Sequence, residues 1–317
     1  MSSSILVSII ICTHNPRSDY LNRVLEALKY QTLSKDIWEL LLVDNASEKI
    51  LSSEIDLSWH SQARHIREEQ LGLTPTRLRG IREAKAETLV FVDDDNILEA
   101  NYLQEALHIL QSMPSLGAIG GQIIPEYELS PPEWLFPYEN KLAIRRIDRS
   151  VWSNNRDDWQ AIPWGAGLVI RKNVCTVYSK ALEIDPRRAM LDRKGDLLIS
   201  GGDTDMALTC LELDLGFGVF ESLGITHLIS KRRLTEDYML RLIRGLHTSS
   251  FLLPYLRGET IPQKADRKSL LYKEARRIYH LFFKKSVIAQ KVEAAIIAGE
   301  DDFEQIILKL NKSKIFD

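Results

Sequence analysis

Short apolar runs that alternate with helical patterns constrain the fold of this sequence more than any other feature. The first run, residues 5–12, is β-branched and almost continuously apolar, as expected for a strand buried on both faces of a parallel sheet. Runs at 38–43 and 88–92 repeat it, and residues 19–33 between the first two carry apolar side chains at helical spacing. This alternation predicts an α/β fold with a mainly parallel sheet and helices on both faces.

Polar residues follow directly after three of the predicted strands. They are Thr13-His14-Asn15, Asp44-Asn45 and Asp93-Asp94-Asp95. Ligands of open parallel sheets bind beyond the carboxyl ends of the strands. We therefore expect these side chains to converge on one binding site.

The three consecutive carboxylates suggest a cation site. Asp93 and Asp95 lie two residues apart on extended chain, so both point to one side and repel each other unless a cation lies between them. Oxygen ligands suit Mg²⁺ or Mn²⁺, which bind through one or two carboxylates and substrate phosphates. The alternative is a solvated acidic turn that caps a helix over residues 97–110. Asp94 points the other way and is expected to brace the turn or cap that helix.

Composition describes an ordinary soluble globular chain. The 317 residues are 44% hydrophobic and 27% charged, and a formal net charge of −3 gives no general attraction for nucleic acid. Cys12, Cys175 and Cys210 form no paired motif, which argues against zinc and disulfides and favours the reducing cytoplasm. We interpret residues 1–12 as a first strand and not a signal peptide. No apolar run reaches the roughly 18 residues of a spanning helix.

The middle of the sequence differs from the first part in composition and pattern. Residues 121–165 are rich in Pro, Trp and charge and have no clean period, which is typical of a binding wall or lid, although a passive surface excursion is the alternative. Trp134, Trp159 and Trp164 offer rings that could stack on sugars, or they are buried structural side chains. Trp164, beside Gly165, is the strongest candidate for an acceptor contact.

Seven motifs in register resemble family 2 glycosyltransferases with the GT-A fold. In order they are VSIIICTHNP, LLVDNAS, TRLRGIREAKAETLVFVDDDN, GAGLVIRK, GDLLISGGDTDMALTCLELDLGFGVFE, THL and RLTEDYMLR. The resemblance implies an enzyme that transfers a sugar from a nucleotide-diphosphate sugar, expected to be a UDP-sugar, to an acceptor with inversion at the anomeric carbon. It implies a GT-A domain over 1–245, with a nucleotide-sugar half at 1–120 and an acceptor half at 121–245. Residues 246–317 are expected to form a helical extension.

The resemblance also assigns the donor-binding residues. Those of the donor site are Thr13, His14 and Asn15 for the nucleoside, Asp44 for the base, Arg77 for the diphosphate, and Asp93, Asp94 and Asp95 around the D-x-D signature. Mn²⁺ or Mg²⁺ is expected at Asp93, Asp95 and His227. For His227 an ordinary histidine at a strand end is the alternative.

Asp203 is the implied general base. It matches the Asp of the family's Glu-Asp motif, and an inverting displacement needs one carboxylate to take the proton of the acceptor hydroxyl, which typically contributes about 10²- to 10⁴-fold in rate. Gly202 stands where relatives often have Glu, and Leu78 replaces a common Asn. Asp205 is kept on the acceptor side as a substitute or helper.

The last part of the sequence is basic. Eight Lys or Arg against two acidic residues over 264–286 suggest either peripheral contact with an anionic membrane that carries lipid-linked acceptors, or a packing or homodimer helix. The expected acceptor is a glycan or a lipid-linked sugar in polysaccharide or glycoconjugate synthesis. The main alternative function is an impaired sugar-nucleotide-binding or scaffold protein, because of Gly202. A nicotinamide dehydrogenase is disfavoured because the first strand ends in THNP and not in a Gly-rich turn.

Overall fold

A computed structural model describes residues 4–193, 198–259 and 286–313. The chain forms two compact units. The first contains Met1–Pro131, Leu135–Ala189 and Gly202–Lys231, and the second contains Pro132–Trp134, Met190–Gly201 and Arg232–Asp317. The main division therefore falls after Lys231, ahead of the boundary expected at residue 245.

The first unit is built on a sheet of nine strands. The strands are β1 (Val7–Thr13), β2 (Trp38–Asn45), β3 (Ala63–Glu68), β4 (Thr88–Val92), β5 (Asn96–Leu98), β6 (Leu116–Tyr127), β7 (Val151–Ser153), β8 (Val169–Arg171) and β9 (Gly216–Ile229). Their order is β3-β2-β1-β4-β8-β6-β9-β5, and β7 pairs with β9. The first four strands are parallel, whereas β8, β5 and β7 pair antiparallel with their neighbours. The predicted α/β class is confirmed, with a sheet that is mixed beyond β4.

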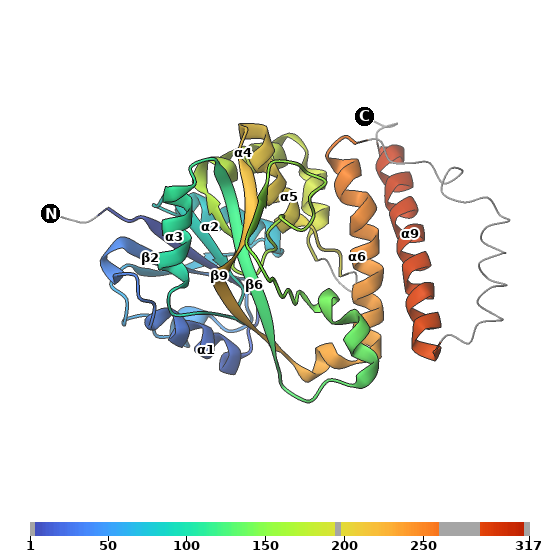
Figure 1. Cartoon of the computed structure of the whole chain (residues 1–317), viewed down its shortest axis with the longest axis horizontal. Helices are drawn as coiled ribbons and strands as arrows, with labels where there is room; N and C mark the ends of the chain where they lie inside the picture. Colours follow the sequence, from blue (N-terminus) through green and yellow to red (C-terminus); the bar gives the residue numbers. More distant parts are fainter. Residues whose placement is uncertain (1–3, 194–197, 260–285, 314–317) are drawn as a thin grey trace. The chain divides into compact units, whose positions relative to one another are not determined.

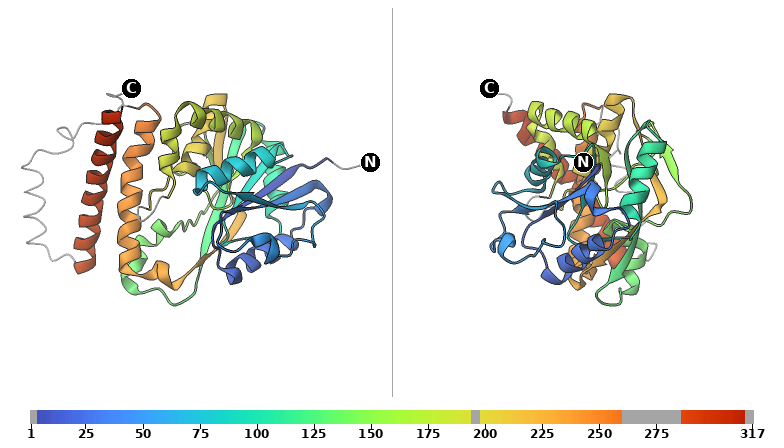
Figure 2. Two further views of the ribbon diagram at one scale, coloured as in Figure 1. Left: turned by 180° about the vertical axis from the view of Figure 1, so that it is seen from behind. Right: turned by 90° about the vertical axis from the view of Figure 1, so that its left-hand side faces the viewer.

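Helices cover both faces of this sheet (Figure 1 and Figure 2). The α-helices of the first unit are α1 (Ser18–Lys29), α2 (Leu73–Glu83), α3 (Tyr102–Ser112), α4 (Lys172–Ile184) and α5 (Gly202–Leu208). The 3₁₀ helices along the chain are Lys35–Ile37, Leu51–Ser53, Glu133–Leu142, Pro186–Leu191, Thr209–Leu213 and Lys231–Leu234. One core cluster joins α1 and α3 to alternate residues of β1, β2 and β4. On the other face α2 packs closely against β1. A Cβ added at Gly80 of α2 would lie 2.4 Å from Cγ2 of Ile10.

The chain after the three aspartates departs from the sequence prediction. Residues 97–110 were expected to form one helix, but Asn96–Leu98 is a strand and α3 begins only at Tyr102. The cause is long-range pairing, since Ile97 and Leu98 lie opposite Thr226 and Ile225 of β9. The aspartates therefore precede a strand and do not cap a helix.

The second unit contains two long helices, α6 (Glu236–Leu256) and α9 (Val287–Ser313). Their contacts advance in the same direction along both, from the Lys291–Glu236 ion pair to the ring contact of Tyr255 with Phe303, so they pack side by side and parallel (Figure 1). None of the helices in the described parts combines the length and apolar character needed to cross a bilayer. The basic segment 264–286, for which membrane contact or dimerisation was predicted, lies outside the described residues except for its last one.

Candidate active site

The register of the sheet brings the ends of β1 and β4 together. Ile11 lies opposite Val92 in the parallel pair, so two residues later Thr13 meets Asp94. The buried Thr13 hydroxyl donates a hydrogen bond to Oδ2 of Asp94. The middle aspartate thus joins the two strand ends at the predicted donor edge.

The turn after β1 interlocks with the turn after β2. The backbone N–H of Asn15 donates to Oγ of Ser47 at 2.9 Å, and Glu48 N–H donates to Oδ1 of Asn15 at 2.9 Å. Asn15 and Ala46 both have φ of 47°, a left-handed conformation that costs an alanine roughly 1–2 kcal/mol. Backbone strain of this kind persists where the surroundings hold it and is concentrated at functional sites.

His14 is exposed at the same turn. Its Nδ1 lies 2.7 Å from the carbonyl oxygen of Asn45, which fixes this nitrogen as the donor. Nε2 is then an acceptor, and the amide of Asn15 lies 3.2 Å from it. The ring is therefore oriented by the end of β2 and held at the surface of the predicted nucleoside region.

Asp44 is the penultimate residue of β2, and its carboxylate is buried. It accepts hydrogen bonds from Ser47 N–H at 3.0 Å and from Arg67 at 2.6 Å. Burial opposes its ionisation, but the Ser47 hydrogen bonds, Arg67 and the Leu51 N–H outweigh burial and hold the pKa of Asp44 below its ordinary value. Asp44 is thus an anion anchored by Arg67, which is directly opposite it on β3.

Asn45 links the end of β2 to the start of α2. Its amide nitrogen donates to the carbonyl oxygens of Glu68 and Gln70, and its Oδ1 accepts from Gly72 N–H at 2.8 Å. Gly72 has φ of 135°, which only glycine adopts readily, and it precedes the first residue of α2. This arrangement fixes the beginning of the helix that carries the buried Arg77.

One side chain bridges the two carboxylates of the predicted cation site. The Asn96 amide nitrogen donates to Oδ1 of Asp95 at 2.8 Å and to Oδ2 of Asp93 at 3.2 Å. Asn96 is completely buried, and its Oδ1 is a buried oxygen without a hydrogen-bond partner in the described part of the chain. The amide therefore holds both carboxylates within reach of one nitrogen, where their mutual repulsion is reduced.

His227 lies beside this cluster. It is opposite Asn96 in the pair of β5 and β9, and its Nε2 is 3.4 Å from Oδ2 of Asp95. Across the residues that the structure describes, no group of three or more His, Cys, Asp or Glu side chains is already arranged to hold a metal ion. The two carboxylates offer oxygen donors of the kind that Mg²⁺ and Mn²⁺ bind together with substrate phosphates.

Asp203 lies in the first turn of α5, half-buried. Its Oδ2 accepts a hydrogen bond from Gly165 N–H at 2.6 Å. Within the described residues, Oδ1 has no protein partner. Gly165 permits this close approach, because a Cβ there would lie 2.9 Å from Oδ2 and 3.1 Å from the Asp203 Cβ. One carboxylate oxygen is anchored and the other can accept a proton.

Trp164 precedes Gly165 and is half-buried. The Arg145 guanidinium lies over its ring, with 4.8 Å between Cζ and the ring centroid. Arg145 also donates to the carbonyl oxygen of Ile162 at 2.7 Å and to that of Gln160. The segment that carries the predicted acceptor residues is thereby held in place.

Asp205 does not lie where an acceptor contact requires it. Its side chain is completely buried and accepts two hydrogen bonds from Arg188, at 2.6 and 2.8 Å. Residues two apart on a helix point in different directions, so Asp205 does not share the surroundings of Asp203. The prediction of Asp205 as an acceptor residue is wrong, and its role is to pair with Arg188.

The sequence interpretation missed three residues of this region. Asn96 lay just before the predicted helix 97–110 and was given no role, Arg67 was not singled out, and Arg145 lay in the predicted binding wall or lid without a role of its own. Only Arg67 had a usable signal, since a polar residue at the end of β3 falls in register with Asp44 once the strand order is known. The other two depend on pairing between segments far apart in the sequence.

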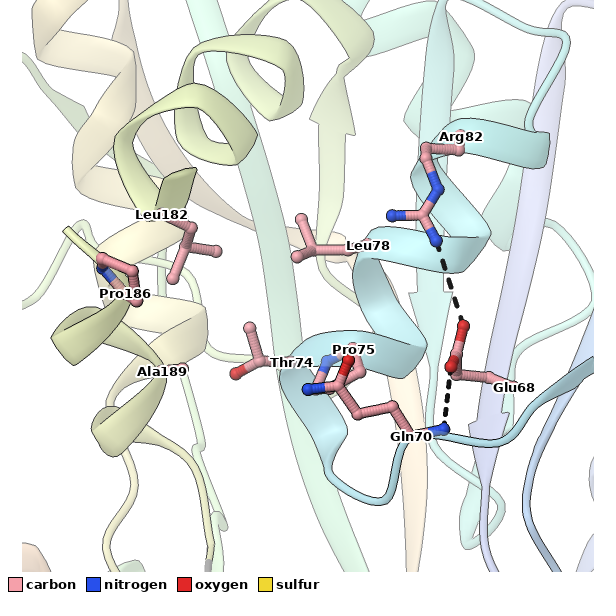
Figure 3. A pocket seen from close by; sticks show the side chains of 9 residues that line it. All are labelled: Glu68, Gln70, Thr74, Pro75, Leu78, Arg82, Leu182, Pro186 and Ala189. Carbon is pink, nitrogen blue, oxygen red and sulfur yellow. Dashed lines mark hydrogen bonds and ion pairs between the residues drawn. The ribbon is translucent and has the colours of Figure 1, made fainter. Parts of the chain in front are cut away.

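A separate hollow of about 190 Å³ lies between α2 and the end of α4 (Figure 3). Leu78 and Leu182 point toward one another across it, with Pro75 on the α2 side and Pro186 on the α4 side. None of the predicted site residues lines it. Leu78, where the family often has Asn, therefore packs toward α4.

Comparisons with known proteins indicate the family of the first half of the chain. Residues 8–164 match the family described as Glycosyl transferase family 2. Glucosyl-dolichyl phosphate glucuronosyltransferase of Haloferax volcanii is 23% identical over 208 residues, which are 65% of this chain and 63% of that protein. The match thus spans less than two thirds of the length of that relative.

Solved structures of S. aureus TarS are similar in fold. TarS 1-349 in complex with UDP-GlcNAc has a TM-score of 0.53 at 16% identity, covering 95% of this chain and 81% of that one. The complex of TarS 1-349 with UDP has a TM-score of 0.51 at 16% identity, covering 89% and 74%. At this identity the likeness concerns the fold, and it confirms the predicted GT-A architecture.

Proposed function

Residues 8–164 belong to glycosyl transferase family 2, and on that premise we propose that this chain is a metal-dependent inverting glycosyltransferase. It moves a sugar from a UDP-sugar to a hydroxyl of a glycan or lipid-linked acceptor. The observation that carries the proposal is Asp203, whose carboxylate is anchored through one oxygen by Gly165 N–H and can receive a proton on the other. The donor edge at the ends of β1, β2 and β4 belongs to the same compact unit.

The donor site is assigned to the strand ends. The anchored Asp44 and the oriented His14 offer acceptors for a base and a ribose. Arg77 supplies the positive charge that a diphosphate needs, because a guanidinium binds phosphate oxygens in a fixed fork. The TarS complexes contain UDP and UDP-GlcNAc, which supports uridine as the base.

Asp93, Asp95 and His227 would hold the cation. The fit rests on Asn96, whose buried and unpartnered Oδ1 would face the two carboxylates if the amide turned over, replacing a donor by a ligand oxygen. When bound, Mn²⁺ or Mg²⁺ neutralises negative charge on the diphosphate.

The chain's own residues then account for the transfer. The acceptor oxygen forms a bond to the anomeric carbon while the bond from that carbon to the diphosphate oxygen breaks on the opposite face. The proton of the acceptor hydroxyl passes to Oδ1 of Asp203. Gly165 N–H keeps the carboxylate directed at the acceptor, and the Arg145–Trp164 stack keeps Gly165 in place.

The name of the Haloferax relative supports a lipid-linked acceptor, since that protein is a glucosyl-dolichyl phosphate glucuronosyltransferase. A soluble glycan is the other acceptor class that the proposal includes. Location at the inner face of the cell membrane would suit the first of these.

Calorimetric titration with UDP, GDP and UDP-sugars, each with and without Mn²⁺, tests the donor assignment. We expect UDP and a UDP-sugar to bind in the presence of Mn²⁺ and more weakly without it. Asp95→Ala should remove the effect of the metal, and Asp94→Ala should cost far less. If no nucleotide binds in either condition, the donor site is misassigned.

Asp203→Asn tests the base. The amide keeps the size of the side chain and can still accept from Gly165 N–H, so donor binding should be unchanged while transfer falls by about 10²- to 10⁴-fold. Gly202 favours a second candidate, a sugar-nucleotide-binding protein with impaired catalysis. Wild-type protein that binds UDP-sugar but transfers to no acceptor, with the same residual hydrolysis in Asp203→Asn, would favour that candidate.

A further inference from the structure

A second hollow lies on the loop that includes β7. We propose that the hollow lined by residues 151–153 and 157–161, called here the β7 hollow, binds neutral sugar rings of the acceptor glycan beyond the ring that reacts. The hollow has a volume of about 490 Å³. The identity of the glycan as an acceptor rests on the proposed function, whereas binding itself can be measured independently.

Two tryptophans on the walls of the β7 hollow are exposed to solvent. Trp152 is 57% exposed and Trp159 is 59% exposed. Large aromatic side chains are usually buried, and exposed ones that share a hollow indicate a binding surface. A pyranose ring presents C–H groups to such an indole face, while its hydroxyls remain available to polar neighbours.

The polar groups of the hollow match sugar hydroxyls. Asp157 and Asp158 supply carboxylate acceptors, and Gln160 supplies both an acceptor and a donor. None of the eight lining residues is cationic. Two carboxylates without a lining cation repel an anionic chain, so the hollow selects neutral glycans over uronic acid polymers or phosphate-rich polymers.

The loop is held in one conformation before any ligand binds. The Ser153 hydroxyl donates to Oδ2 of Asp158 and accepts from Asn155 N–H at 3.0 Å. Asn155 Oδ1 accepts from Asp157 N–H at 3.1 Å, and Ala161 N–H donates to the carbonyl oxygen of Asp158 at 2.8 Å. A loop ordered in advance loses less entropy on binding, which favours a recognition role.

The β7 hollow is also tied to the proposed catalytic segment. Arg145 donates to the carbonyl oxygens of Gln160 and Ile162 and lies over Trp164, whose neighbour Gly165 binds Asp203. The five residue-to-residue steps from Trp159 to Trp164 can span at most about 18 Å. One oligosaccharide of a few rings can therefore reach from the hollow toward Asp203.

The test measures binding of neutral hexasaccharides to the full chain by tryptophan fluorescence and calorimetry. The probes are N-acetylchitohexaose, cellohexaose and maltohexaose, with hexagalacturonic acid as the anionic probe. At least one neutral probe should bind, and Trp152→Ala/Trp159→Ala should weaken that binding about tenfold or more. Tyr30→Ala is the matched control, since Tyr30 is 66% exposed at the end of α1 and should leave binding unchanged.

The same samples are titrated with UDP and Mn²⁺ to separate the two proposals. Retained UDP binding in the double variant, together with lost hexasaccharide binding, supports the β7 hollow. The proposal is overturned if no neutral probe binds the wild type, if the double variant binds as tightly as the wild type, or if the anionic probe binds more tightly. If UDP binds neither the wild type nor the variants, the proposed function is refuted. The hexasaccharide titrations then still test binding at the β7 hollow by themselves.

Discussion

Gly165→Ala should separate catalysis from folding and from donor binding. A Cβ at this position would lie 2.9 Å from Oδ2 of Asp203, 3.3 Å from its Cγ and 3.1 Å from its Cβ. Ordinary contacts between such atoms begin near 3.4 Å. The Asp203 side chain must therefore move by about half an ångström, which weakens its hydrogen bond from the backbone N–H.

The cost of that movement is small for stability and large for the reaction. The carboxylate is half-buried and can rotate toward solvent, so we expect the free energy of unfolding to fall by about 1 kcal/mol or less. A displacement of about 1 Å at reacting groups can reduce rate about 100-fold, so a smaller one should lower kcat about 10- to 100-fold. The KM of the donor should change little.

The assay follows release of UDP with a donor and acceptor pair that supports turnover, beside thermal unfolding and calorimetric titration of UDP. Gly117→Ala is the steric control, since a Cβ there would lie 2.7 Å from Sγ of the buried Cys210. We expect this control to lose stability and to keep kcat within about threefold. An unchanged kcat in Gly165→Ala would refute the idea that the position of Asp203 limits the reaction.

Three further predictions concern the rest of the first unit. Asn96→Ala removes the amide between two carboxylates and should lower the free energy of unfolding by about 2 kcal/mol. Because the variant also lacks the ligand oxygen that the turned amide would supply, Mn²⁺ should raise its Tm less than that of wild type, and an equal shift would contradict the ligand role. Arg188→Ala removes the guanidinium that pairs with the buried Asp205 carboxylate and should lower the free energy of unfolding by about 3–5 kcal/mol in urea unfolding, whereas Arg188→Met/Asp205→Leu should recover much of it. Burial, with a smaller effect of the nearby Lys35 charge, lowers the pKa of His60 to about 4. Because only the unfolded chain takes up that proton below about pH 6.5, stability should fall by up to about 3 kcal/mol between pH 6.5 and 4, and His60→Gln should flatten the fall if the sign is correct.

The sequence predicted the donor half of the fold well. The apolar runs at 5–12, 38–43 and 88–92 became β1, β2 and β4, and their polar ends meet at one edge of the sheet. These features are local, because a buried strand and an amphipathic helix are each specified by the spacing of apolar residues along a short segment. The seven motifs, taken in order, also predicted the family, and the family model matches residues 8–164.

The later half was less predictable. Ile97 and Leu98 of β5 were predicted to begin a helix because they suit either structure, and only the hydrogen bonds to β9 decide between them. The side-chain partners were equally hidden: Arg67 for Asp44, Arg188 for Asp205 and Gly165 N–H for Asp203 come from distant positions.

By itself the sequence determined the alternating α/β plan, the edge of the sheet where the polar residues gather, and the family of the first half. Spacing along the chain can do this because secondary structure and strand ends are set by neighbouring residues. Only the tertiary structure decided which carboxylates are available. Asp203 has one oxygen anchored and one available, while Asp205, two residues on, is buried in an ion pair with Arg188. That difference depends on which distant groups pack against each side chain, and residue spacing does not encode it.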